Sequence, residues 1–259
     1  MKKKLFFFAF LCLLLITGCT SSNKIDKIKR SGKIKIFTNA NFPPFEYIKG
    51  EKIVGVDIEI SKKIAEEIGV EEKIIDADFD GVISAIASGK ADIGIAAITI
   101  NEKRKEEIDF SVPYFKSTQF LILPEESNTK TIEELTNKRV AVAIGYSGQI
   151  ALEEENKNGA LKENPSKITH INSISEGILE LKNKKVDAFI IDEQPAKKII
   201  LENPEFKAIK LIYKDGNDIS EEYGIAIPKN NPELLNIVNE VIKKMIEKNE
   251  INKLVIEYS

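Results

Sequence analysis

The sequence predicts an α/β fold with two similar lobes, each built on a mixed, mostly parallel sheet flanked by helices. Two observations predict it: short β-branched runs alternate with segments of helical periodicity, and this order of elements occurs twice along the chain. Strands that alternate with helices form mostly parallel sheets with helices on both faces. A repeated order of elements indicates that one structural plan is used twice.

The first set of elements opens with a strand and continues as alternating helices and strands. We expect, in order, a strand at 33–38, a helix at 57–68, a strand at 73–76, a helix at 81–88 and a strand at 91–95. The second set is expected as a strand at 140–144, a helix at 175–182 and a strand at 188–191, and a helix at 232–247 follows. The two sets match best where an apolar helix, a basic turn and a strand with an Asp follow one another.

The N-terminus carries the pattern of a secretory signal. Three lysines after Met1 precede an apolar run at 5–16, which is shorter than the ~20 residues of a membrane span. The run ends in Leu15-Ile16-Thr17-Gly18-Cys19, which resembles a bacterial lipobox. We therefore expect a signal peptide at 1–18, lipidation of Cys19, a polar tether at 19–23 and an extracytoplasmic, lipid-anchored protein. The alternative is an ordinary signal peptide with an incidental cysteine.

Composition excludes several classes of function. The two cysteines are Cys12 and Cys19, so the mature chain has no disulfide, and its one histidine argues against a His/Cys metal cluster or a Ser-His-Asp triad. Without the three signal lysines, 35 of the 38 basic residues remain against 41 acidic ones. This even, slightly acidic charge argues against nucleic-acid binding. We expect neither a metal nor a cofactor.

Candidate binding residues follow the predicted strands. Ligands of open α/β sheets bind beyond the carboxyl ends of the strands, which here present 39–42, 96–99, 145–148 and Asp192. If the two lobes face each other, these ends converge on one cleft. An arginine, Arg104, and an aspartate, Asp192, on opposite sides of that cleft would complement the carboxylate and the ammonium of a zwitterion.

Eight motifs in order cover nearly the whole mature chain: N-F-P-P-F-E-Y (41–47), V-G-V-D-I-E-I (54–60), D-F-D-G-V-I-S-A-I (78–86), G-K-A-D-I-G-I-A-A-I-T-I-N-E-K-R (89–104), I-D-F-S-V-P-Y (108–114), V-A-V-A-I-G-Y-S-G (140–148), V-D-A-F-I-I-D (186–192) and Y-G-I-A-I-P-K (223–229). With them the chain resembles the substrate-binding proteins of ABC transporters for polar amino acids, the extracellular solute-binding proteins of family 3, with a periplasmic binding protein-like type II fold. The resemblance implies a monomer that takes a free amino acid to an ABC permease and its ATPase.

The same resemblance implies the lobes and their hinge. Lobe 1 would comprise 24–116 and 222–259, and lobe 2 would comprise 117–221. A two-stranded hinge would cross near 114–118 and 220–223, with the ligand in the cleft between the lobes. Hinge closure would then bury the ligand.

The resemblance also implies eight ligand-binding residues: Asn39, Phe42, Phe79, Ala97, Thr99, Arg104, Ser147 and Asp192. The two phenylalanines would sandwich the ligand side chain, and Asn39 would face its end. The Ala97 carbonyl and Asp192 would hold the ammonium. Thr99, Arg104 and Ser147 would hold the carboxylate.

The chain departs from the family at three places that bear on the ligand. Asn39 stands where many relatives carry Asp, Tyr146 replaces a small hydroxyl residue, and Ala143 and Ile191 occupy positions that are often polar. Without a carboxylate at residue 39 a cationic side chain has no fixed partner there. We therefore expect a neutral polar amino acid as the ligand.

Other interpretations stay open at this point. Asp192 could cap the helix that follows it, and Arg104 could be a solvated helix residue. The whole chain could be a secreted enzyme that resembles cyclohexadienyl dehydratases, with Glu46 or Asp192 as the proton donor, or a ligand-sensing domain. We expect a binding protein and not an enzyme, because neither carboxylate stands in a pattern that singles out proton transfer.

Overall fold

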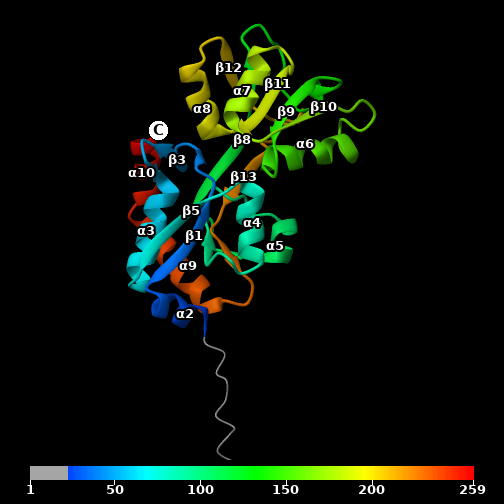
Figure 1. Cartoon of the computed structure of the whole chain (residues 1–259). Helices are drawn as coiled ribbons and strands as arrows, with labels where there is room; N and C mark the ends of the chain where they lie inside the picture. Colours follow the sequence, from blue (N-terminus) through cyan, green and yellow to red (C-terminus); the bar gives the residue numbers. More distant parts are fainter. Residues whose placement is uncertain (1–22) are drawn as a thin grey trace, which may run out of the picture.

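The computed structural model describes residues 23–259. The predicted signal peptide 1–18, Cys19 and residues 20–22 lie outside the described residues. Figure 1 shows two bodies, one around β1 and α3 and the other around β9 and α7, with β8 and β13 between them. We call these bodies lobe 1 and lobe 2.

Lobe 1 is built on a five-stranded sheet in the order β5-β1-β6-β14-β7. Its strands are β1 (Lys33–Thr38), β5 (Glu71–Asp76), β6 (Ile93–Gly94), β7 (Ile108–Phe110) and β14 (Ala226–Pro228). Strand β1 runs parallel to β5 and β6, whereas β14 is antiparallel to β6 and β7. A small sheet of β2 (Asn41–Phe42), β3 (Glu46–Lys49) and β4 (Lys52–Val54) extends the lobe.

Helices flank the sheet of lobe 1 on both sides (Figure 1). The helices are α2 (Lys24–Ser31), α3 (Val56–Ile68), α4 (Phe79–Ala87), α5 (Glu102–Glu107), α9 (Pro232–Glu247) and α10 (Glu250–Tyr258). Alternation in β1 explains its position, because Ile34 and Ile36 are fully buried while Lys33 and Lys35 are exposed. The apolar side of α3 packs with α9 and α10, so the C-terminal segment belongs to this lobe.

Lobe 2 holds a second mixed sheet in the order β10-β9-β11-β8-β12, with β13 beside β8. Its strands are β8 (Phe115–Pro124), β9 (Arg139–Ala143), β10 (Lys167–Ile171), β11 (Ala188–Asp192), β12 (Phe206–Lys210) and β13 (Ser220–Tyr223), and its helices are η2 (Glu133–Leu135), α6 (Ser147–Lys157), α7 (Ile174–Lys182) and α8 (Glu193–Glu202). Strands β10 and β11 run parallel to β9, as β5 and β6 do to β1.

The chain passes between the two sheets along two paired segments. Strand β13 is antiparallel to the start of β8, with Phe115 opposite Tyr223 and Thr118 opposite Ser220. Strand β8 then continues into the sheet of lobe 2, and β13 leads to β14 in the sheet of lobe 1. This arrangement places the paired strands directly beside the junction of the lobes.

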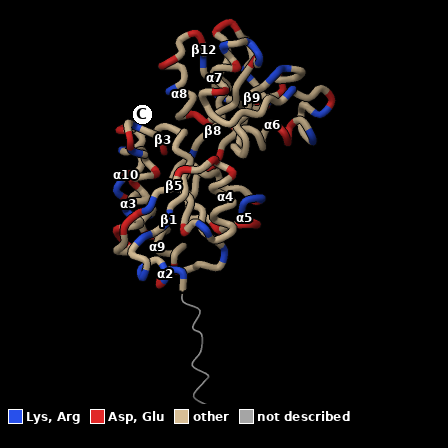
Figure 2. The backbone as a smooth tube through the Cα atoms, viewed as in Figure 1, with Lys and Arg blue, Asp and Glu red and all other residues tan. Residues whose placement is uncertain are grey.

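The fold class predicted from the sequence is confirmed: two mixed sheets flanked by helices. The helix expected at 232–247 is α9 itself, whereas the strand expected at 91–95 is limited to Ile93–Gly94. Backbone hydrogen bonds to β1 nevertheless extend beyond it, since the N–H of Asp92 donates to the carbonyl of Lys35 at 2.9 Å and the N–H of Ile95 to the carbonyl of Phe37 at 3.0 Å. Figure 2 shows basic and acidic residues interspersed over both lobes. From Asn23 onward, no helix combines the length and the apolar character needed for a membrane crossing.

Candidate functional site

A small cavity lies where the two lobes meet. Lobe 1 lines it with Phe42, Phe79, Ala96, Ala97, Thr99 and Arg104, and lobe 2 lines it with Tyr146, Ser147 and Asp192. Seven of the eight residues predicted to bind a ligand are in this set. The cavity volume is about 10 Å³, which is room for roughly one water molecule.

Arg104 is buried at the cavity, with 8% of its surface exposed. The short helix α5 presents it, and the side chain of Asn101 caps that helix by accepting from the Arg104 N–H at 2.9 Å. The guanidinium donates to the carbonyl of Thr99 at 2.7 Å and, across the junction, to the carbonyl of Gly145 at 2.8 Å. The alternative of a solvated helix residue is therefore wrong.

The charge of Arg104 is retained despite its burial. Desolvation lowers its pKa to about 10, and attraction to Glu221, Asp192 and Asp80 opposes that change. A group with this pKa is still protonated at neutral pH. The guanidinium also lies 5.1 Å from the centre of the Phe79 ring, a distance at which a cation is attracted to the ring face.

Ala97 stands at the end of the predicted strand with a left-handed backbone, φ 43°. Its N–H donates to the buried carboxylate of Asp57 at 2.8 Å, and Asp57 also accepts from the hydroxyl of Tyr114. A non-glycine residue in this conformation stores strain, and such strain is kept where the surroundings hold it. The backbone around Ala97 is thus held in one geometry at the cavity wall.

Asp192 ends β11 and is 3% exposed. It precedes α8, but its side chain makes no capping hydrogen bond, so the capping interpretation is wrong. Instead it accepts from the hydroxyl of Tyr223, a residue of β13. Burial, together with the nearby carboxylate of Glu221, raises the pKa of Asp192 well above its ordinary value.

Two further carboxyl groups near the cavity are not among the eight predicted binding residues, although Glu46 was considered as the proton donor of an enzyme. Glu221, in β13, accepts hydrogen bonds from the side chains of Thr99 and Gln119. Glu46 is 1% exposed, and its Oε2 has no hydrogen-bond partner. Burial raises the pKa of Glu46 well above its ordinary value, and Asp57 and Asp192 raise it further. Glu46 lies within the first of the eight motifs, whereas Glu221 stands in an unremarkable acidic run, so only Glu46 had a signal.

Asn39 is not among the residues that line the cavity. Its amide nitrogen donates to the carbonyl of Ala77 at 2.9 Å, and its amide oxygen accepts from the hydroxyl of Tyr146 at 3.1 Å. The Tyr146 ring lies 5.0 Å from that of Phe79 and 5.7 Å from that of Phe42. Tyr146, noted in the sequence only as a departure, is therefore in contact with three of the eight predicted residues.

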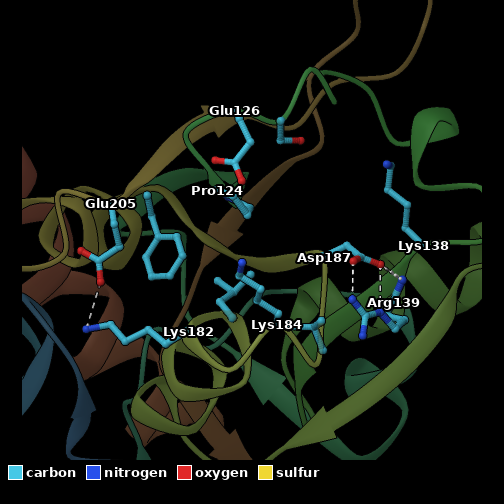
Figure 3. Close-up of a pocket in the computed structure, with 12 residues that line it drawn as sticks. Pro124, Glu126, Lys138, Arg139, Lys182, Lys184, Asp187 and Glu205 are labelled. Carbon is cyan, nitrogen blue, oxygen red and sulfur yellow. Dashed lines mark hydrogen bonds and ion pairs between the residues drawn. The ribbon is translucent and has the colours of Figure 1, made fainter.

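A larger open depression lies at the other end of lobe 2, where β9 begins (Figure 3). Its volume is about 720 Å³. Two ion pairs lie in it, Arg139 with Asp187 at 2.6 Å and Lys182 with Glu205 at 3.2 Å. None of the eight predicted residues lines it, so size alone does not identify the candidate site.

The chain is similar to known proteins both in sequence and in fold. The chain is 31% identical to an arginine-binding extracellular protein of Bacillus subtilis, over 98% of this chain and 96% of that protein. It superposes with a TM-score of 0.81 on the amino-acid ABC-transporter substrate-binding protein AbpA of Streptococcus pneumoniae bound to L-arginine, at 30% identity, covering 90% of this chain and 97% of that one. The solved structure has the same two-lobed α/β fold.

A more distant relative is an enzyme, a cyclohexadienyl dehydratase of Pseudomonas aeruginosa, 23% identical over 67% of this chain and 68% of that protein. The more similar relatives are described as binding proteins, which confirms the prediction of a binding protein over an enzyme. A family model also matches residues 34–259, nearly the whole described chain. The chain belongs to the bacterial extracellular solute-binding proteins, family 3.

Proposed function

We propose that this protein binds a free amino acid between its two lobes and delivers it to an ABC importer. The observation that carries the proposal is that Arg104 of lobe 1 and Asp192 of lobe 2 line the same cavity. A guanidinium pairs with an α-carboxylate, and a carboxylate pairs with an α-ammonium. Because the two groups belong to different lobes, a zwitterion that bridges them favours the closed arrangement.

The two connecting strands support the proposed division into lobes. Lobe 1 comprises 24–116 and 222–259, and lobe 2 comprises 117–221, with β8 and β13 as the hinge. Paired strands that cross once in each direction leave the lobes free to rotate about one axis. The transporter would then recognise a monomer in its closed shape.

The proposed roles of the binding residues follow their chemistry. Arg104, Thr99 and Ser147 hold the α-carboxylate, because they offer a guanidinium and two hydroxyl groups. Asp192 and the carbonyl of Ala97 hold the α-ammonium. The rings of Phe42 and Phe79 enclose the side chain, and Asn39 lies toward its far end.

The charges around the cavity favour a cationic side chain. Among residues 23–259, Arg104 is the one buried basic side chain, whereas the acidic groups of Glu46, Asp57, Asp192 and Glu221 are all buried. A neutral zwitterion brings one positive and one negative charge, so it adds no net positive charge to offset this excess of acid groups. A second positive charge allows another carboxyl to ionise. We therefore replace the expected neutral ligand by arginine or a similar cation, the ligand of the relatives reported above.

The N-terminus is proposed to attach the protein to the cell surface. Cleavage after residue 18 would leave Cys19 to carry lipid, with the tether 19–23 between the lipid and α2. The family description as extracellular proteins supports an extracytoplasmic location. The partners at the membrane would be the permease and ATPase subunits of the importer.

Titration calorimetry of residues 20–259 tests this function. The ligands would be the twenty amino acids, ornithine, cystine and prephenate. We expect saturable binding of arginine or lysine, with weaker binding of neutral amino acids. Binding of no amino acid would contradict the proposal, and release of phenylpyruvate from prephenate would support the dehydratase instead.

A further inference from the structure

The space expected for the ligand is filled by the protein itself. Tyr146 belongs to lobe 2, directly before α6, yet its ring contacts both Phe42 and Phe79 of lobe 1. Those two rings are the ones proposed to enclose the ligand side chain. The Tyr146 ring meets them at 71° and 57°, the tilted geometries that aromatic pairs prefer.

The polar end of Tyr146 is satisfied as well. Its hydroxyl donates to the amide oxygen of Asn39 at 3.1 Å, and Asn39 is fixed by its bond to Ala77. A buried phenol without a partner would be unfavourable. Asn39 removes that penalty, so the same residue that was expected to face the ligand side chain receives the hydroxyl of Tyr146.

The residue before Tyr146 meets Arg104. The carbonyl of Gly145 accepts from the guanidinium at 2.8 Å, where the α-carboxylate of a ligand is proposed to lie. Glycine is favoured there, because its φ of 81° strains other residues and a Cβ would lie 2.3 Å from an oxygen of the Asp80 carboxylate, which would have to move. Gly145 therefore offers Arg104 a hydrogen-bond acceptor, and Tyr146 offers Phe42 and Phe79 an aromatic ring.

The cavity is too small to hold an amino acid while the Tyr146 ring lies between Phe42 and Phe79. About 10 Å³ is left in the cavity, which admits roughly one water molecule and no amino acid. The lobes also contact each other here through the bonds from Arg104 to Gly145 and from Tyr146 to Asn39. A ligand can enter only after these contacts open.

Resting on the function proposed above, we propose that Tyr146 is a specificity-determining residue that competes with the ligand for the space between Phe42 and Phe79. The ring holds the lobes together when no ligand is bound. Only the fraction of molecules in which the space between Phe42 and Phe79 is free can bind an amino acid, so the apparent Kd rises as that fraction falls. Long side chains, which need that space, are affected more than short ones. Tyr146 thus weakens binding and shifts selectivity.

The test combines a measurement without ligand and one with ligand. Small-angle scattering would give the radius of gyration of the ligand-free wild type, Tyr146→Ala, Tyr146→Phe and a control, Tyr213→Ala, which removes a lobe 2 tyrosine outside the cavity lining. Calorimetry would give Kd for arginine and alanine. We expect a larger radius for Tyr146→Ala and an arginine Kd lower on the order of 10-fold, with a smaller change for alanine.

The other variants sharpen the result. Tyr146→Phe keeps the ring and loses only the bond to Asn39, so its radius and Kd should lie between those of the wild type and Tyr146→Ala, and Tyr213→Ala should match the wild type. An unchanged radius of gyration in Tyr146→Ala would overturn the inference, since the ring would then not hold the lobes together. Weaker arginine binding by Tyr146→Ala would also overturn it, since the ring would then contact the bound ligand favourably. If Tyr146→Ala enlarges the radius of gyration but no amino acid binds to the wild type or to the variant, the result would contradict the proposed function and support the cross-lobe role of Tyr146.

Discussion

The surroundings of Arg104 and of Arg139 show two ways in which this chain holds a guanidinium. Arg139, at the start of β9, is about half exposed and donates to both oxygens of the Asp187 carboxylate, at 2.6 and 3.1 Å. Arg104 is buried, and its guanidinium donates to two neutral backbone carbonyls. Hydrogen bonds between two charged groups are the stronger kind. A ligand carboxylate would therefore form stronger hydrogen bonds with Arg104 than the two carbonyls do, whereas Arg139 already pairs with a carboxylate.

The same contrast explains why the larger depression is not the candidate site. The depression near Arg139 has about 70 times the volume of the cavity at Arg104, 720 against 10 Å³. Its two ion pairs, however, are exposed to solvent, where such pairs contribute little. At the smaller cavity the charges are buried and partly unpaired, and a ligand gains most from such groups.

The largest expected effect is the loss of the buried arginine. Arg104→Ala should weaken arginine binding by about 3–5 kcal/mol, because the ligand carboxylate would be buried without a partner. Calorimetry of the variant measures this loss. Arg139→Ala is the matched control and should leave Kd within about twofold. Equal Kd values for the wild type and Arg104→Ala would contradict the zwitterion geometry.

The carboxylates can be compared in the same way. Asp192→Asn keeps the shape of the side chain and removes the charge that faces the ammonium, so binding should weaken by about 2 kcal/mol. Asp187→Asn, at the partner of Arg139, should leave binding unchanged. Calorimetry at pH 7 measures the Kd for arginine of both variants. A greater loss in Asp187→Asn than in Asp192→Asn would shift the site to the depression in Figure 3.

The two regions should also respond oppositely to pH. Burial raises the pKa of Asp57 to about 6, whereas hydrogen bonds from Arg139 lower the pKa of Asp187. A raised carboxyl pKa means that the folded protein binds the proton more tightly than the unfolded chain. Its contribution to the free energy of unfolding is therefore largest below the unfolded pKa and is lost as the pH rises through about 6.

Thermal or urea unfolding of the ligand-free protein measures that difference. Relative to Asp57→Asn, the wild type should gain about 1 kcal/mol between pH 7 and pH 5. The Arg139–Asp187 pair should contribute less, with the opposite sign, because the pair is exposed. A wild type that loses stability relative to Asp57→Asn as the pH falls from 7 to 5 would contradict the raised pKa of Asp57.

The smallest effect concerns the stability contributed by the exposed pair. Arg139→Ala should lower the free energy of unfolding only slightly, and that loss should shrink in high salt, because exposed ion pairs are screened. Urea unfolding at two salt concentrations measures it. A loss that salt does not change would indicate that Arg139 contributes through packing of its aliphatic chain.

Much of the fold could be predicted because it depends on local patterns. The alternation of Ile34 and Ile36 with lysines indicates β1, and Pro232 at the first turn indicates the start of α9. Seven predicted residues meet at the cavity because the strand ends of both lobes face the junction. The motifs located those ends without any knowledge of their contacts.

Other features depend on contacts between distant residues and could not be predicted. Glu221 becomes a cavity neighbour only because β13 pairs with β8 and brings it to Thr99. Tyr146 lies against Phe42 only when the lobes meet. A sequence pattern shows which face of an element is apolar, but not which rotamer fills a space shared by two lobes.

A crystal structure of residues 20–259 with L-arginine tests the central claim most directly. The account predicts the ligand carboxylate on Arg104, its ammonium on Asp192, and the Tyr146 ring moved away from Phe42 and Phe79. Arginine bound in the depression beside Arg139, or bound at the cavity with its charges turned away from Arg104 and Asp192, would contradict the account.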